Sequence, residues 1–414
     1  MIKRTESSPL SRRQLISSAS GLGLTGLAIQ GLTRPAEALA RGQSAAHGLR
    51  TTKIEVIVVA VTFRTNWIFV RLGTNKGLTG LGEASLGAAK GLPELKQFFD
   101  LVEGESPLDI LGYRRRAWAA AARGGRRTAT AFSAIEQALW DLTGKALGAP
   151  VHQLFAEHAT RPLPVYANIN RATTERTPSG FSESARKAVE EGFRAVKAAP
   201  FDGFPALDSP GSQIRQAVEL GVESIGAMRA AIGDSIKLKI DAHSNFDVDL
   251  AVEVAHSVAP YSLSWYEEPV APTDLESTTA IREAIPQRLA GGEFLFAVEG
   301  FRALCLANAV DVIMPDVKHC GGLLEASRIS LLGEVQGIAV APHNPSGPVS
   351  TAASAQICTA LPNFEILELQ WGEAPWRADL VEPPEDFQQG ELIPAQGPGL
   401  GVTLNQKVLK EHRL

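Results

Sequence analysis

The feature that most constrains the fold is a plan repeated eight times after Pro162. Each repeat is a short apolar run that ends in polar residues, followed by a longer stretch with the periodicity of a helix. The runs cover residues 164–168, 195–199, 237–243, 263–269, 288–293, 311–317, 337–344 and 364–370. Strands that alternate with helices form parallel sheets with right-handed crossovers, and eight such units fit a (β/α)8 barrel of the TIM type. The alternative is an open doubly wound sheet, but the G-x-G-x-x-G turn usual in that fold does not follow the first run.

A smaller unit precedes the barrel. Between residues 53 and 84, β-branched and aromatic residues alternate with others around a turn at 74–77, which indicates an antiparallel meander. Apolar residues then recur at helical spacing, at Phe132, Ile135, Leu139 and Leu142. We therefore expect an α/β protein with an α+β capping domain over residues 51–160, a barrel over 162–382, and a final segment, 383–414, that returns to the capping domain.

The first 40 residues have the features of an export signal. Arg12 and Arg13 precede a weakly apolar, Gly-rich run that ends near Gln30, and residues 38–40 (Ala-Leu-Ala) form a small-x-small cleavage site. The paired arginines are similar to those of the twin-arginine pathway, so we expect a periplasmic protein. A disordered tail or a membrane anchor is the alternative. No other segment approaches about 18 consecutive apolar residues, so we expect no membrane association of the mature protein.

The charge balance argues against one class of partner. The chain has 40 Lys and Arg residues against 45 Asp and Glu residues, for a formal net charge of -5. Proteins that bind a phosphate backbone usually carry a basic surplus. We therefore expect no nucleic-acid partner.

Three of the predicted strands end in carboxylates. Asp241, Glu267 and Glu293 follow one another at equal intervals of 26 residues, at the ends of the third, fourth and fifth runs. The carboxyl ends of barrel strands meet at one mouth, so these side chains should converge. Crowded carboxylates repel one another, and a hard divalent cation with oxygen ligands relieves that repulsion. The three acids thus predict a Mg2+ site with one ion; the alternative is that each pairs with a Lys or Arg at a strand end.

The next two strands end in an acid and an imidazole. Asp316 ends the sixth run, and His343 ends the seventh. Neighbouring strand ends bring these side chains within reach of each other. A carboxylate that fixes the tautomer of an imidazole and raises its basicity is what a general base requires. We therefore expect His343 and Asp316 to act as a pair.

Taken together, these residues resemble a known family. Lys197 on the second strand, the three acids, Asp316 and His343 are similar to the site of the mandelate racemase subgroup of the enolase superfamily, a subgroup grouped with muconate lactonizing enzymes. The segments 79–84 (TGLGEA) and 134–141 (AIEQALWD) look like its capping-domain signatures. The resemblance implies that Asp241, Glu267 and Glu293 bind Mg2+, that His343 and Asp316 form the base pair, and that the chain forms a homo-oligomer.

Two departures within this resemblance refine the expected reaction. Racemases of the subgroup usually carry Lys-x-Lys on the second strand, whereas this chain has Lys197, Ala198 and Ala199. His243, two residues after the first acid, is instead similar to a histidine of galactonate and mannonate dehydratases that protonates a departing hydroxyl. The resemblance therefore implies dehydration of a sugar acid to a 2-keto-3-deoxy acid.

Supporting roles are expected for other side chains. We place Lys197 beside the substrate carboxylate and Glu368, at the end of the eighth strand, as a hydrogen-bond partner of the intermediate; a strand-end salt bridge is the alternative for Lys197 and a structural role for Glu368. Asn66 and Trp67, with Arg64 and the loop 123–126, are candidates for substrate binding from the capping domain, with surface or packing roles as the alternative.

Three other functions remain open from the sequence. An epimerase would use His243 and His343 as bases on opposite faces of the substrate. A glycosidase would use Glu267 and Glu293 as its carboxylate pair and would need no metal. A non-catalytic sugar-acid binding protein would usually be a two-lobed open sheet.

Overall fold

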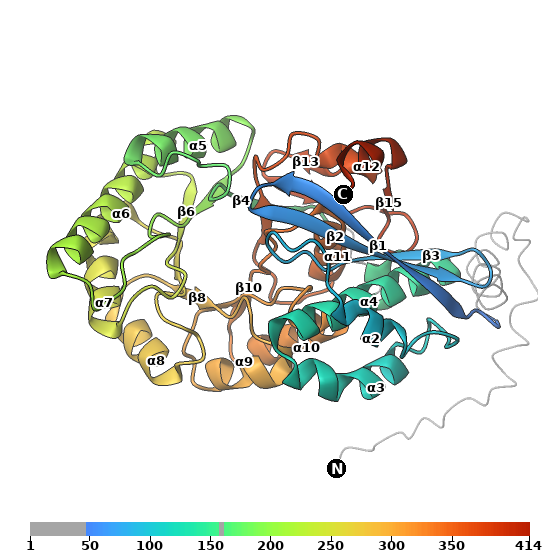
Figure 1. Ribbon diagram of the computed structural model, residues 1–414. Coiled ribbons are helices and arrows are strands. Elements are labelled where there is room, and N and C mark those ends of the chain that lie inside the picture. Colours follow the sequence, from blue (N-terminus) through green and yellow to red (C-terminus); the bar gives the residue numbers. More distant parts are fainter. Residues whose placement is uncertain (1–46, 157–160) are drawn as a thin grey trace, which may run out of the picture.

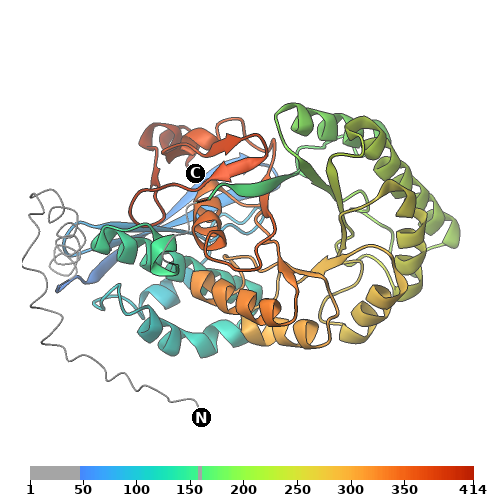
Figure 2. The same ribbon diagram turned by 180° about the vertical axis from the view of Figure 1, so that it is seen from behind.

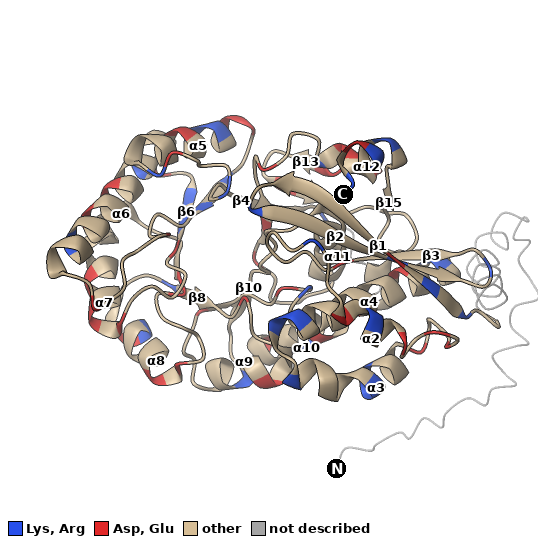
Figure 3. Ribbon diagram, viewed as in Figure 1, with Lys and Arg blue, Asp and Glu red and all other residues tan. Residues whose placement is uncertain are grey.

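The computed structural model describes residues 47–156 and 161–414 of the chain. The expected export signal over residues 1–40 lies outside the described residues. Figure 1 shows a large ring of strands and helices with a smaller unit packed on one side of it. Figure 3 shows that basic and acidic residues are interspersed on the outer helices. Within the described part of the chain, no helix has both the length and the apolar character needed to cross a membrane.

Eight short strands form the wall of the ring. Their bounds are β4 (Leu163–Asn168), β5 (Ala195–Ala198), β6 (Lys237–Asp241), β7 (Trp265–Glu267), β8 (Leu289–Gly291), β9 (Val312–Ile313), β10 (Ala339–Val340) and β11 (Leu367–Gln370). Strands β4 to β10 pair in chain order and in parallel, and β11 pairs in parallel with β4. A parallel bridge between Val340 and Phe364 closes the ring. Seven of the eight strands lie within the apolar runs of the sequence, and β4 begins one residue before its run, at Leu163. The sheet is closed into a barrel.

The helices between these strands cover the outside of the barrel, as both views show (Figures 1 and 2). Several begin at a capping side chain: Thr177, Asp247 and Asp274 each accept a hydrogen bond from a backbone N–H of the first turn. The helices are α5 (Pro178–Glu190), α6 (Gly211–Ile232), α7 (Val248–Ser257), α8 (Leu275–Ala284), α9 (Ala297–Leu306), α10 (Gly322–Val335) and α11 (Pro348–Cys358), with a short 3-10 helix, η2 (Ala259–Tyr261).

The capping domain is a three-stranded antiparallel meander packed on three helices. Its elements are β1 (Thr51–Thr62), β2 (Thr65–Thr74), β3 (Thr79–Glu83), α2 (Glu94–Phe99), α3 (Ile110–Arg123) and α4 (Gly125–Leu147), followed by η1 (Val151–Leu154). Gly82 explains how closely β3 approaches α4. A Cβ at this position would lie 2.1 Å from the carbonyl oxygen of Ala134, so no side chain fits there.

Buried carboxylates join the capping domain to the barrel. Glu83, at the end of β3, accepts hydrogen bonds of 2.7 Å from the N–H groups of Gly347 and Ser350 at the start of α11. Glu136 in α4 accepts bonds from Leu323 and Leu324 in the first turn of α10. A negative charge is stabilising at a helix N-terminus. The two contacts therefore fix the capping domain against the last helices of the barrel.

The last part of the chain packs beside both units. Its elements are η3 (Ala378–Leu380), β12 (Val381–Glu382), β13 (Asp386–Gln388), β14 (Glu391–Ile393), β15 (Thr403–Leu404) and α12 (Gln406–His412). The hairpin of β13 and β14 extends the start of β4, and β12 pairs with β15. The N–H of Leu414 donates to the carbonyl of Val58 in β1, so the chain ends against the capping domain.

Candidate active site

The three strand-end acids converge at one mouth of the barrel. Asp241 ends β6 and lies directly opposite Glu267 at the end of β7, while Glu293 follows β8 by two residues. Each offers a carboxylate oxygen, and these oxygens lie within 4.8 Å of one another. All three side chains are buried. Burial and the neighbouring Asp241 carboxylate raise the pKa of Glu267 well above its usual value.

Lys197 on β5 is the one lysine in direct contact with this cluster within the described residues. Its Nζ lies 2.6 Å from Glu267, 3.3 Å from Asp241 and 3.2 Å from Glu368, and the side chain is buried. Burial alone would lower the pKa of Lys197, but Glu267 and the other acids raise it well above its usual value, so the lysine is an ammonium. One ammonium among these carboxylates leaves an excess of negative charge. A set of hard oxygen donors with excess negative charge fits Mg2+, and the three strand-end acids are the residues that would hold it.

His343 and Asp316 form a buried pair. Nδ1 of His343 lies 2.8 Å from Oδ2 of Asp316, which turns Nε2 toward Glu293 at 3.2 Å. Asp316 is held in turn by the backbone N–H and the ammonium of Lys318. Burial would lower the pKa of His343, but Glu293, Glu368 and Asp316 raise it. Such an imidazole can accept a proton at Nε2 from a bound molecule.

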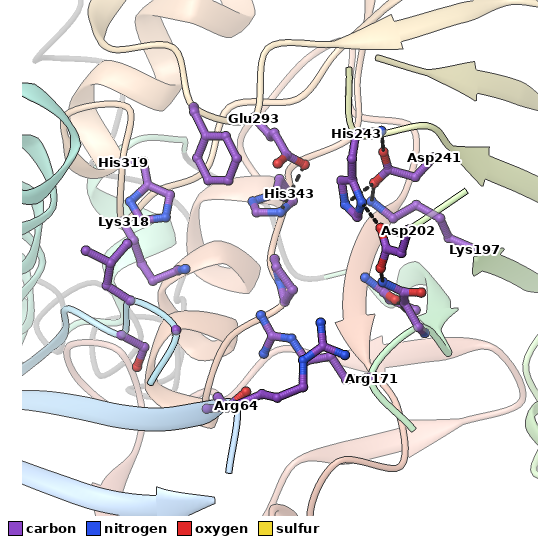
Figure 4. Close-up of a pocket in the computed structure, with 18 of the residues that line it drawn as sticks. Arg64, Arg171, Lys197, Asp202, Asp241, His243, Glu293, Lys318, His319 and His343 are labelled. Atoms are coloured by element: carbon purple, nitrogen blue, oxygen red, sulfur yellow. Dashed lines mark hydrogen bonds and ion pairs between the residues drawn. The ribbon is translucent and has the colours of Figure 1, made fainter. Parts of the chain in front are cut away.

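His243 lies on the opposite side of the mouth. Strands β6 and β10 are four positions apart in either direction around the eight-stranded ring, so His243 and His343 face each other across the mouth, and both line it in Figure 4. Nε2 of His243 is 3.2 Å from Asp241, and Nδ1 is 2.5 Å from Asp202. Burial would lower its pKa, but the Asp241 carboxylate and the bond with Asp202 raise it to about 12. His243 is therefore protonated, so its imidazolium has a proton that it can donate to a bound molecule.

Its backbone is in an uncommon conformation. The φ angle of His243 is 47° and that of Ser244 is 55°, in the left-handed region that L-residues rarely adopt. The N–H of His243 donates to Asp241, and the N–H of Ser244 donates to the carbonyl of Glu268. These bonds hold the sharp turn that directs the imidazole back over the strand end.

Glu368 is buried behind the wall of the cavity. It accepts hydrogen bonds from Asn168 at 2.6 Å and from the N–H of Asn344 at 2.8 Å, in addition to the contact with Lys197. Burial would raise its pKa, but Lys197 and His343 lower it, so the group is a carboxylate. In this structure Glu368 contacts Lys197, the predicted partner of the substrate carboxylate, and its bonds position that ammonium.

A cavity of about 450 Å³ opens above these residues. The barrel contributes Lys197, Asp241, His243, Glu293 and His343 to its lining, and the capping domain contributes Arg64, Thr65, Ser85, Leu86, Gly87 and Arg126. The structure does not bring Asn66 and Trp67 into this lining. Asn66 donates to the carbonyls of Ala88 and Ala89, and Trp67 is fully buried with its ring edge against Trp376. Trp67 instead packs between the sheet of the capping domain and the segment that follows β11, and Asn66 is held by the loop that follows β3.

Comparison with known proteins agrees with this architecture. Residues 49–156 match the model of the mandelate racemase/muconate lactonizing enzyme N-terminal domain, and residues 180–408 match the model of the enolase C-terminal domain-like family. The chain belongs to the mandelate racemase/muconate lactonizing enzyme family of the enolase superfamily. A D-xylonate dehydratase from Haloferax volcanii is 32% identical over 88% of this chain and 90% of that protein. A D-gluconate dehydratase from Thermoproteus tenax is 34% identical over 69% of this chain, a match that spans 56% of that protein.

A solved structure of the same family shows the same fold. The mandelate racemase/muconate lactonizing enzyme from Sulfitobacter sp. is 28% identical, with a TM-score of 0.79 over 88% of this chain and 95% of the other. Its likeness extends over both the capping domain and the barrel. The eight-stranded ring described above is therefore the enolase-superfamily barrel.

Several residues of the site in this family member were not predicted from the sequence. Asp202, in the loop after β5, contacts His243; Asn170 and Arg171, after β4, line the cavity, as do Lys318 and His319 after Asp316. The rule that polar residues at barrel strand ends face the mouth would have selected Asn170 and Arg171, which follow the first strand directly. Asp202 lies four residues after the last residue of β5, and no spacing in the sequence signals its contact with His243.

Proposed function

We propose that this protein is a Mg2+-dependent sugar acid dehydratase that converts its substrate to a 2-keto-3-deoxy acid and water. The observation that carries the proposal is the pair of histidines across the mouth: His343 is backed by Asp316, while His243 lies between two carboxylates. One imidazole is thereby suited to take a proton and the other to give one. The relatives named as D-xylonate and D-gluconate dehydratases support the same chemistry.

The difficulty of the reaction lies in the charge it creates. Removal of a proton next to a carboxylate places a second negative charge on the substrate. Mg2+, when held by Asp241, Glu267 and Glu293, supplies Lewis-acid stabilisation of that charge. Lys197 adds a fixed ammonium beside the same carboxylates, and its bond to Glu368 keeps it directed at the mouth.

Two histidines then transfer the protons. Nε2 of His343 takes the α-proton, and Asp316 stabilises the imidazolium through Nδ1. His243 gives its proton to the β-hydroxyl as the bond between that oxygen and the β-carbon breaks. The electron pair of the broken C–H bond forms the new double bond, and the resulting enol tautomerises to the ketone. Asp202 and Asp241 hold the imidazole of His243 in place for this step.

Three further proposals rest on the sequence. The paired arginines Arg12 and Arg13 support export by the twin-arginine pathway to a bacterial periplasm. The pattern of the chain supports a division into a capping domain (51–160), a barrel (162–382) and a C-terminal segment (383–414). The family resemblance supports a homo-oligomer.

The experiment separates the two proton transfers. Purified protein with Mg2+ is incubated with sugar acids in D2O, and keto acid is measured with a carbonyl reagent while α-proton exchange is followed by NMR. We expect His343→Asn to lose both signals and His243→Asn to lose keto acid while still exchanging the α-proton. The control, His256→Asn, changes an exposed histidine of α7 and should retain both activities. EDTA should abolish both activities of the wild type; keto acid that still forms in EDTA would refute the dependence on Mg2+.

The facing histidines also favour a second candidate, an epimerase that uses both as bases. In that case the wild type would exchange the α-proton and invert the carbon without forming keto acid. The binding-protein alternative expected an open two-lobed sheet, and the closed ring of strands differs from it.

A further inference from the structure

The cavity has two chemically different ends. One end holds Asp241 and Glu293 with the two histidines, and in Figure 4 the guanidinium groups of Arg64 and Arg171 enter the cavity on the side away from Glu293. The cavity is therefore acidic where the reacting carboxylate would bind and basic at the other end. A bound sugar acid would extend from the first end toward the second.

Arg64 has no carboxylate of its own. It lies in the two-residue turn between β1 and β2, and the one hydrogen bond it makes among the described residues is from its backbone N–H to Thr62. Its guanidinium forms no ion pair with any described residue, although it lines the cavity. Two lysines near the reacting end are paired: Lys197 contacts three acids, and Lys318 contacts Asp316. Arg126, which also lines the cavity, lies over the ring of Phe294.

The surroundings of Arg64 are themselves basic. Arg171 also lines the cavity and uses only Nη1 to bind Glu373, at 3.2 Å, so its Nε and Nη2 make no hydrogen bond within the described part of the chain. Burial lowers the pKa of Arg176; Asp202, which pairs with it at 3.3 Å, raises it, and the nearby charge of Arg64 lowers it further. Like charges placed together are unfavourable unless an anion joins them. An anionic ligand would bind both free guanidinium edges and relieve this repulsion.

We propose that the substrate carries a second anionic group at the end of its carbon chain remote from the reacting carboxylate, and that Arg64 and Arg171 bind this group. The inference rests on the proposed function and names its substrate class: an aldarate, or a sugar acid with a terminal phosphate, in preference to an aldonate that ends in a hydroxymethyl group. Planar guanidinium groups match both anions, and their hydrogen bonds to a neutral hydroxyl are weaker.

The test compares acids that differ at one carbon. Galactarate and galactonate share their configuration and differ in having a carboxylate or a hydroxymethyl group at C6, as do D-glucarate and D-gluconate; 6-phosphogluconate supplies the phosphate. We expect kcat/KM of the wild type to be at least about tenfold higher for the substrate with the second anion. A factor of ten lies at the low end for a charge-assisted hydrogen bond, and we expect the low end because Arg64 is exposed. Preference for a diacid or for the phosphate identifies which anion is bound, and either result supports the inference.

The variant Arg64→Gln keeps the length and polarity of the side chain and removes its charge. We expect it to lower kcat/KM for the doubly charged acid about tenfold more than for the matched aldonate. The control, Arg302→Gln, changes an exposed arginine of α9 outside the cavity and should leave both classes of substrate unchanged. Added KCl should raise KM for the doubly charged acid more steeply than for the aldonate.

Failure of this inference can be told apart from failure of the proposed function. If the protein dehydrates aldonates as well as or better than the matched diacid and phosphate, and Arg64→Gln has no effect, the inference is overturned and the proposed function stands. If no acid of any class yields keto acid or exchanges its α-proton, both are overturned.

Discussion

Replacing Lys239 with Met should stabilise the protein, and the gain should disappear as the pH rises. Lys239 is on β6, two residues before Asp241, and its side chain is fully buried inside the barrel. Its ammonium lies over the rings of Trp265, at 4.0 Å, and Tyr166, at 5.5 Å, and Nζ has no hydrogen-bond partner among the described residues. The aromatic faces replace only part of the lost hydration.

Burial lowers the pKa of Lys239 from 10.5 to about 7, and the charge of Lys237 contributes to the same shift. Between these two values the unfolded chain binds a proton on this lysine that the folded protein does not, so the free energy of unfolding rises with pH by about 1.4 kcal/mol per pH unit. Relative to a residue that does not titrate, Lys239 should destabilise the protein by about 4 kcal/mol at pH 7.5 and by about 1 kcal/mol at pH 9.5. Lys239→Met removes the titrating group and keeps an unbranched apolar chain.

The assay is urea unfolding of metal-free wild type and variant between pH 7.5 and 9.5. The difference between the two free energies of unfolding should fall by roughly 2–3 kcal/mol over this range. The control is Lys410→Met, which changes an exposed lysine of α12 and should alter stability by less than about 0.5 kcal/mol at every pH. A Lys239→Met variant that is less stable than the wild type, or a difference that does not depend on pH, would show that Lys239 is a solvated or paired ammonium and would refute the reasoning.

Two further predictions concern the metal and the contact between domains. Mg2+ at 100 times its Kd should raise the free energy of unfolding by about 2.7 kcal/mol in thermal denaturation, and Glu293→Gln should remove most of that gain; an equal gain in this variant would exclude Glu293 as a ligand. Arg114→Ala leaves the buried carboxylates of Glu136 and Glu325 without their arginine, and should lower the free energy of unfolding in urea by about 3–5 kcal/mol. The control, Arg116→Ala, changes an exposed arginine and should lower it by less than about 1 kcal/mol. Equal losses in the two variants would contradict a buried ion pair.

The barrel and the acids at its mouth could be predicted because both follow from local order along the chain. Parallel strands present their carboxyl ends on one side, so consecutive strand ends become neighbours in space. This rule alone predicts that Asp241, Glu267 and Glu293 lie close together, and in the described structure their carboxylate oxygens lie within 4.8 Å of one another. The same rule predicted the contact between His343 and Asp316, which the 2.8 Å distance confirms.

The parts of the cavity that could not be predicted depend on contacts between elements far apart in the sequence. Asn66 and Trp67 are close to Arg64 in the chain, but neither lines the cavity. Thr65 and Trp67 lie on the same face of β2, yet Thr65 lines the cavity while Trp67 packs against Trp376, so the alternation of the strand does not separate them. Asp202 reaches His243 only through the path of the loop after β5, which no periodicity describes.

The two capping-domain segments that resemble family signatures, 79–84 and 134–141, contain no residue that bears on proton transfer, and the structure gives a physical reason for their sequence. Glu83 and Glu136 each hold the start of a barrel helix, and Asp141 accepts the N–H groups of Leu81 and Leu400. Each of these carboxylates is fully buried, so loss of its partners would leave a charge without solvent. Because the capping domain contributes Arg64 to the cavity, these bonds hold the β1–β2 turn that carries Arg64 against the barrel. In the function proposed above, recognition of a remote anion therefore depends on buried carboxylates that do not line the cavity.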